Sequence, residues 1–132
     1  EYLPHNHVKN SVVYPGTHDN TTITAWWESA ATPKEKATAA AYLHLTGAHP
    51  TAKELAAVKT ADARTALLRA ALGSVADRAI IPLYDWLGLG AEAHLNTPGK
   101  LGGNWAWRAE AGFESKTLAK TIADECSVYC RV

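Results

Sequence analysis

Hydrophobic and polar residues recur along this chain at spacings that predict a mostly helical protein. The first helix is expected around Trp26 and Trp27, with Thr21 or Thr22 as its N-cap. Four further helices are predicted, over residues 34–46, 53–58, 61–72 and 115–128. Gly47 and Gly73 are expected to end the first and third of these, because glycine commonly follows the last turn of a helix.

Two short apolar runs break the helical pattern and are typical of buried strands. They cover residues 11–14 and 78–85, and they are rich in β-branched and aromatic side chains. The order of strand, helices, strand, long loop and helix indicates consecutive βα units, hence an α/β fold with two short parallel strands. Two strands cannot bury both faces of a parallel sheet. We therefore expect residues 1–132 to form one partial domain, with the other strands before residue 1.

Composition narrows the classes of function. The chain has 132 residues, of which 47% are hydrophobic, enough for one domain or part of one. It contains no methionine, so we expect a fragment. Thirteen basic residues balance thirteen acidic ones, which argues against nucleic acid or an anionic membrane surface as a partner. No signal peptide or membrane-spanning run is recognisable.

The first strand candidate leads into a polar cluster that could carry chemistry. Pro15 and Gly16 break the strand, and His18, Asp19 and Asn20 follow. In βα units such side chains lie at the carboxyl end of the strand, where active sites are found. A carboxylate there could bind the hydroxyls of a polyol or balance a developing positive charge. The alternative is that Asp19 caps the next helix or closes a turn.

Other polar residues allow further hypotheses. His5, His7 and His18 with Asp19 could be assembled into a metal site, although His-x-His spacing alone is a weak signal. Cys126 and Cys130 are expected to be free thiols, because positions four apart on a helix suit a disulfide poorly.

Aromatic residues and glycines gather in the second half of the chain. Tryptophans beside polar loops suit the apolar faces of sugar rings, but one of each neighbouring pair is expected in the core. The long loop after residue 87 is glycine-rich without the spacing of a phosphate-binding loop. Asn104 and Arg108 could bind hydroxyls there or satisfy the loop backbone.

Several segments together resemble the C-terminal portion of the 4-α-glucanotransferases, also called amylomaltases or disproportionating enzymes (glycoside hydrolase family 77). The similarity follows the family's order over nearly the whole chain. The segments are Leu3–His7, Val12–Asn20, Trp26–Trp27, Ala79–Gly90, Asn96–Gly99 and Gly103–Arg108.

This resemblance implies the last two βα units of a (β/α)8 TIM barrel. It also implies an enzyme that transfers α-1,4-glucan segments to glucose or maltooligosaccharides with retention of configuration. By analogy Asp19 would stabilise the transition state and His18 would bind the same sugar, while the nucleophile and the acid/base would lie outside this chain. Substrate binding would fall to six residues: Asn20, Asn96, Pro98, Gly99, Asn104 and Trp105.

The same resemblance sets the expected partners. These are α-1,4-glucans and maltooligosaccharides, with no cofactor or metal, in a bacterial cytoplasm or a plastid stroma. We expect the chain alone to be inactive, because a double displacement needs two further carboxyl groups. We also expect it to self-associate through exposed apolar surface. The alternative is a noncatalytic glucan-binding or structural domain.

Overall fold

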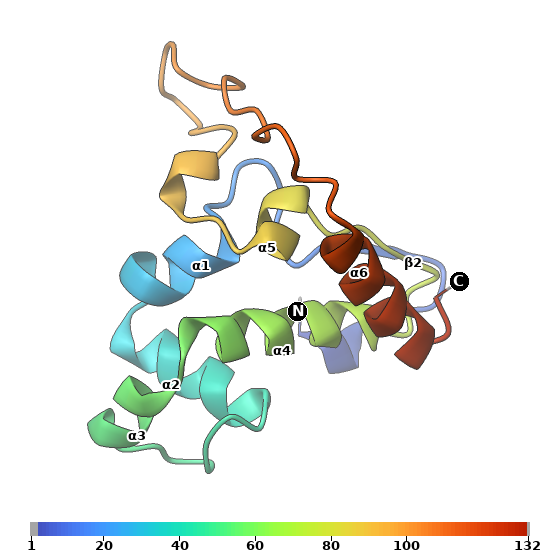
Figure 1. Ribbon diagram of the computed structural model, residues 1–132. Helices are drawn as coiled ribbons and strands as arrows, with labels where there is room; N and C mark the ends of the chain where they lie inside the picture. The colour runs from blue at the N-terminus through green and yellow to red at the C-terminus, as the bar shows by residue number, and fades with distance from the viewer. Residues whose placement is uncertain (1–2, 132) are drawn as a thin grey trace.

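The computed structural model describes residues 3–131 and shows a mostly helical chain with two short parallel strands (Figure 1). This part of the predicted fold class is confirmed. In chain order the elements are η1 (Pro4–Asn6), β1 (Val12–Val13), α1 (Ile23–Ala25), η2 (Trp26–Ala30), α2 (Pro33–Tyr42), α3 (Ala52–Ala57), α4 (Thr60–Leu72), β2 (Arg78–Ala79), α5 (Leu83–Leu87), η3 (Ala91–Ala93) and α6 (Lys116–Val128).

The two strands pair in parallel, as expected of neighbouring βα units. Val12 lies opposite Arg78, and Val13 lies opposite Ala79. The carbonyl of Val13 also accepts a hydrogen bond from the N–H of Ile80, at 2.9 Å. Parallel pairing brings the carboxyl ends of both strands to the same edge of the sheet. The loops that follow β1 and β2 therefore start side by side.

The second strand is much shorter than predicted, because residues 83–87 form helix α5 instead. Pro82 occupies the N-cap position of α5, where it has no N–H to donate to a strand ladder. Asp85 consequently lies in a helix rather than at a strand end. Gly88 ends this helix in the left-handed conformation, with φ of 71°.

The prediction that both strands are buried is wrong for the described chain. Val13 is 7% exposed and packs with Ala71 and Ala76, but Val12 is 43% exposed and Ile80 is 47% exposed. One face of the strand pair is therefore covered by α4 and its C-terminal connection. The other face and the strand edges are open in the part of the chain that the structure describes.

Local capping signals position most helix ends. Thr22 caps α1, and Thr32 and Thr51 form capping boxes with Glu35 and Glu54 at the starts of α2 and α3. Gly73 follows α4 as predicted.

Gly47 does not end the second helix, so that prediction is wrong. α2 stops at Tyr42, Leu43 serves as its C-cap, and His44 follows in the left-handed region with φ of 57°. A residue with φ > 0 cannot continue a right-handed helix, so the chain turns away before Gly47.

A second core cluster lies between the helices. Trp27 in η2 is 5% exposed and packs with Ala40 of α2 and Ala63 of α4, both completely buried. Trp26 is only half-buried, so one member of this pair lies in the core, as predicted. Alanine at the two helix positions leaves room for the indole between the helices.

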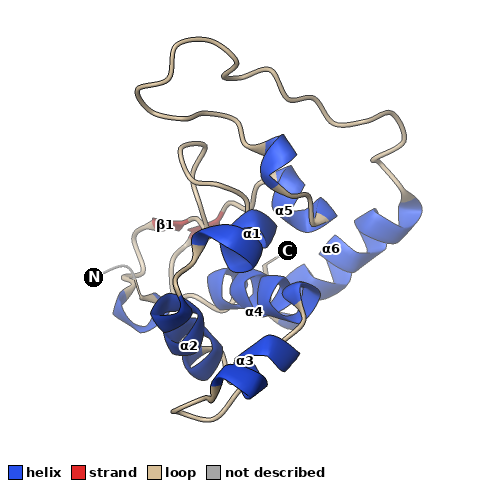
Figure 2. Cartoon of the chain, turned by 90° about the vertical axis from the view of Figure 1, so that its left-hand side faces the viewer, coloured by secondary structure: helices blue, strands red, loops and turns tan. Residues whose placement is uncertain are grey.

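The long loop between η3 and α6 arches away from the helices above α1 and α5, at the end of the molecule opposite α3 (Figures 1 and 2). No helix within residues 3–131 combines the length and the apolar character needed to cross a membrane.

Candidate functional site

The segment after β1 folds into a tight turn that displays His18 and Asp19. The Asn20 side-chain oxygen accepts hydrogen bonds from the N–H and the hydroxyl of Thr17, at 2.8 and 3.0 Å. The N–H of Asn20 donates to the Thr17 carbonyl at 3.0 Å. Because Asn20 closes this turn and Thr22 caps the helix, Asp19 does neither. The side chains of His18 and Asp19 remain about half-exposed, 3.4 Å apart between Nε2 and Oδ1.

The long loop after η3 reaches across to this turn through Asn96. The backbone N–H of Asn96 donates to the His18 carbonyl at 3.1 Å. Its side-chain Nδ2 donates to Oδ1 of Asp19 at 2.5 Å. Asn96 therefore fixes both the backbone and the carboxylate of the turn. Residues 77 positions apart in the sequence form one polar cluster at the carboxyl ends of the paired strands.

Trp105 completes this cluster. Its ring centroid lies 5.0 Å from that of His18, with the ring planes tilted by 41°. Its N–H donates to the Leu95 carbonyl at 2.6 Å, and its φ is 61°. A φ in this range is strained for a bulky residue, and such strain gathers at functional sites. Trp105 is 54% exposed, so much of its indole surface is open beside His18.

The remaining predicted binding residues shape the loop itself. Asn104 accepts from the N–H of Thr97 at 3.0 Å and donates to the carbonyl of Lys100 at 2.9 Å. Between these two bonds, Pro98 and Gly99 form an exposed turn in which Gly99 has φ of 78°. Arg108 donates to the carbonyls of Trp105 and Trp107, at 2.9 and 2.8 Å. Asn104 and Arg108 thus satisfy loop backbone, one of the two roles expected for them.

A groove of about 550 Å³ runs beside the cluster. Its lining includes His18 and Leu95 from the two loops and Tyr14 at the end of β1. Tyr84 and Trp107 form one wall, their rings 6.1 Å apart in an edge-to-face arrangement. Burial raises the pKa of the Tyr84 hydroxyl. An aromatic-lined groove with polar groups at one end suits a ligand that has both apolar faces and hydroxyls.

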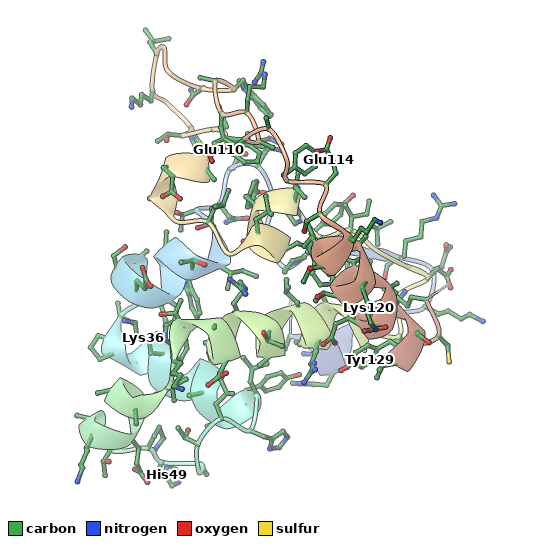
Figure 3. All side chains as sticks on the ribbon, viewed as in Figure 1. Lys36, His49, Glu110, Glu114, Lys120 and Tyr129 are labelled. Carbon is green, nitrogen blue, oxygen red and sulfur yellow. The ribbon has the colours of Figure 1, made fainter. Side chains whose placement is uncertain are left out.

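The hypothesis of a histidine metal site gains no support from the geometry. The His5 ring lies 3.0 Å from the Tyr42 hydroxyl, and the His7 ring lies 2.6 Å from that of Ser74. Within residues 3–131 no three His, Cys, Asp or Glu side chains gather as metal ligands would. His49 lies at the end of the molecule away from the long loop (Figure 3). Cys126 and Cys130 are both free thiols.

Asp85 was not among the predicted site residues, although the structure ties it to the site segment. Its Oδ1 accepts a hydrogen bond from the N–H of Ile23 at 2.8 Å, and only 2% of the residue is exposed. The sequence contained one signal, an acid that closes the second apolar run. The partner 62 positions away could not be read from that pattern.

Taken together, the half-exposed carboxylate, the neighbouring imidazole and the aromatic groove have the chemistry that a sugar ligand would need. Comparison with known proteins gives the family. Residues 1–114 match the profile of the 4-alpha-glucanotransferase family, and the chain belongs to that family.

Curated relatives agree with this assignment. The chain is 40% identical to the chloroplastic/amyloplastic 4-alpha-glucanotransferase of Arabidopsis thaliana, over 99% of this chain and 21% of the relative. It is 42% identical to the 4-alpha-glucanotransferase of Thermus thermophilus, over 84% of this chain and 21% of the relative. The chain thus spans about a fifth of the length of these relatives.

A solved structure matches the fold as well. The amylomaltase of Streptococcus agalactiae in complex with acarbose superposes with a TM-score of 0.79 and 28% sequence identity. The match covers 98% of this chain and 23% of that protein. The described fold therefore corresponds to part of an amylomaltase structure.

Proposed function

We propose that this chain is the C-terminal part of a 4-α-glucanotransferase catalytic barrel, contributing the last two βα units of a (β/α)8 fold. The paired parallel strands, with loops from both carboxyl ends meeting at His18 and Asp19, support this proposal. The open strand surface supports it too. Residues 1–132 would then be one partial domain, and the exposed Val12 and Ile80 would be covered by the rest of the barrel.

The reaction is transfer of an α-1,4-glucan segment to glucose or a maltooligosaccharide with retention of configuration. Retaining enzymes of this kind use a nucleophilic carboxylate and a separate acid/base on opposite sides of the bond, and both lie outside this chain. The Asp19 carboxylate binds hydroxyls of the reacting sugar and stabilises the positive charge of the oxocarbenium-like transition state. His18 hydrogen-bonds the same sugar.

The neighbouring loop supplies the remaining contacts. Asn96 holds the Asp19 carboxylate and offers a hydrogen bond to the glucan, and the open face of Trp105 stacks on a sugar ring. Asn20, Pro98, Gly99 and Asn104 contribute by shaping the two loops that enclose the sugar. No metal or cofactor takes part. We place the protein in a bacterial cytoplasm or a plastid stroma, in starch or maltodextrin metabolism.

The observation that carries the proposal is the Asn96–Asp19 hydrogen bond. It joins a carboxylate of the first βα unit to the long loop of the second unit. In a full-length protein that carries this chain, Asp19→Asn should lower the kcat for disproportionation of maltotriose by roughly 100- to 1000-fold. KM should change far less. A variant with wild-type kcat would refute the assigned role.

The isolated chain should release no glucose from maltotriose, since it holds neither a nucleophile nor a proton donor for the double displacement. A noncatalytic glucan-binding domain remains the second candidate, and the exposed Trp105 favours it. Maltooligosaccharide titration with tryptophan fluorescence separates the two. Sugar-dependent fluorescence that is unchanged in Asp19→Ala would indicate a binding domain only.

A further inference from the structure

Two buried polar side chains meet at one place in the described chain, the amino-terminal end of α1. Thr22 is completely buried, and Asp85 is 2% exposed. The Thr22 hydroxyl accepts a hydrogen bond from the N–H of Ala25 at 3.1 Å, and Asp85 accepts one from the N–H of Ile23 at 2.8 Å. Burying a polar group is costly unless it is hydrogen-bonded, so this helix start is tightly specified.

The two bonds differ in what they connect. Thr22 is a local N-cap: its hydroxyl accepts a hydrogen bond from the N–H of Ala25 in the same helical turn. Asp85 belongs to α5, which follows the other strand, and so its bond joins the two βα units. Ile23 is the first residue of α1 and directly follows the segment that carries His18 and Asp19. A bond at Ile23 therefore fixes the end of that segment against the second unit.

The surroundings of Asp85 hold it in place. Burial raises the pKa of its carboxyl group, while the Ile23 hydrogen bond and the charge of Arg64 act in the opposite direction. Gly88 lies beside that arginine: a Cβ at Gly88 would come within 1.6 Å of Arg64 Nη1. Gly88 also ends α5 with φ of 71°, a conformation that favours glycine. The arginine of α4 thus lies at the end of the short helix that carries Asp85.

The segment 17–22 is consequently anchored twice by the second unit. Asn96 holds its middle through His18 and Asp19, and Asp85 holds its end through Ile23. Without the second anchor, the start of α1 could shift, and the bond between Asn96 and Asp19 would lose its geometry.

We propose that Asp85 is a positioning residue for Asp19: it accepts the Ile23 N–H and thereby sets where the segment 17–22 presents its carboxylate. This inference rests on the proposed function of Asp19. Asp85 itself is buried and does not touch the glucan.

The test compares three variants in the full-length protein that carries this chain. Asp85→Ala removes the acceptor, Asp85→Asn keeps an oxygen that can accept from Ile23, and Thr22→Val removes the local cap without touching the bond between the units. Maltotriose disproportionation is measured at a temperature at which circular dichroism shows every variant fully folded. Hydrogen–deuterium exchange of the segment 17–23 is followed in parallel, with the α3 peptide as an internal control.

Asp85→Ala should lower kcat by about tenfold or more, because small displacements of a catalytic group have large effects on rate, while KM stays within about twofold. Asp85→Asn should restore most of kcat, and Thr22→Val should lower it much less. Exchange of the segment 17–23 should accelerate in Asp85→Ala and stay near wild type in Asp85→Asn, and the α3 peptide should not change.

Three results would overturn the inference: wild-type kcat in Asp85→Ala, an equal loss in Thr22→Val, or unchanged exchange of the segment in Asp85→Ala. Failure of the proposed function has a different signature. If the wild-type protein transfers no glucan, that function is refuted, and the exchange measurement still decides whether Asp85 holds the segment.

Discussion

Arg131 makes three long-range hydrogen bonds to backbone carbonyls, and its removal gives a quantitative test of the fold. Its Nε donates to the Leu72 carbonyl at 2.7 Å, Nη1 to that of Ala76 at 3.0 Å, and Nη2 to that of Ser74 at 2.6 Å. These carbonyls belong to the end of α4 and to the connection that leads into β2. The guanidinium thus secures the turn that delivers the second βα unit.

The size of the effect follows from the number and kind of these bonds. Hydrogen bonds to charged groups contribute about 1.5–3 kcal/mol each, but bonds that share one half-buried group do not add fully. A cation beside the C-terminus of α4 gains a further contribution from the helix dipole. We expect Arg131→Met to lower the free energy of unfolding by about 3–4 kcal/mol. Arg131→Lys should lose about half as much, because an ammonium group cannot reach all three carbonyls.

Urea unfolding of the purified chain, followed by circular dichroism, measures this loss. Arg78→Met is the matched control, since Arg78 is exposed and its side chain makes no hydrogen bond within residues 3–131. The control should stay within about 0.5 kcal/mol of wild type. An Arg131→Met variant as stable as the control would refute the reasoning, because hydrogen bonds from water to the three carbonyls would then stabilise the fold as much as those from the guanidinium.

Three further predictions concern single groups. The hydrogen bonds from Thr51 lower the pKa of the Glu54 carboxyl group, so they stabilise the fold above the ordinary pKa of 4.5, and this contribution is lost as the pH falls through the lowered pKa. In Thr51→Ala, the urea midpoint should fall less between neutral and acid pH than it does in the wild type. Burial raises the pKa of Asp85, so its contribution to stability is fully present below the ordinary pKa of 3.8 and is lost as the pH rises through the raised pKa. Asp85→Asn should remove this loss of stability, and an unchanged dependence of the urea midpoint on pH would contradict the reasoning. Gly88→Ala should destabilise the fold by at least about 1–2 kcal/mol because of its φ of 71°, whereas Gly47→Ala, with nothing within 4 Å of the added methyl group, should be neutral in the same thermal melts.

Local signals explain which parts of the fold could be predicted. Thr22 as N-cap, Gly73 as helix stop and the helix after Ser115 each depend on neighbouring residues, and the structure confirms all three. The errors arose where two local signals competed. The apolar run from Arg78 resembled a strand throughout, but Pro82 favoured a helix start and ended the ladder. Similarly, His44 in a left-handed conformation ended α2 before Gly47 could.

The position of His18 and Asp19 after a strand could be predicted, but the hydrogen bonds that connect this segment to the rest of the chain could not. His18 and Asp19 were recognised from their position after a strand and from family resemblance. The bonds that organise them, from Asn96 to Asp19 and from Ile23 to Asp85, join residues more than 60 positions apart. Such pairs depend on the parallel register of β1 and β2, which no local pattern encodes. For the same reason, Arg131 could not be recognised as a structural anchor from its sequence context.

The tip of the long loop suggests how proteins of this kind could diverge. Leu101 is fully exposed, whereas Gly99 and Gly102 both have φ of 78°, a backbone conformation that favours glycine. Asn104 fastens the base of this tip to Thr97 and Lys100, and so the tip can change without disturbing Asn96 or Trp105. The side chain at position 101 can therefore vary at little cost to folding, while the glycines on either side are held by their backbone conformation. Variation of Leu101 would leave the hydrogen bond between Asn96 and Asp19 intact.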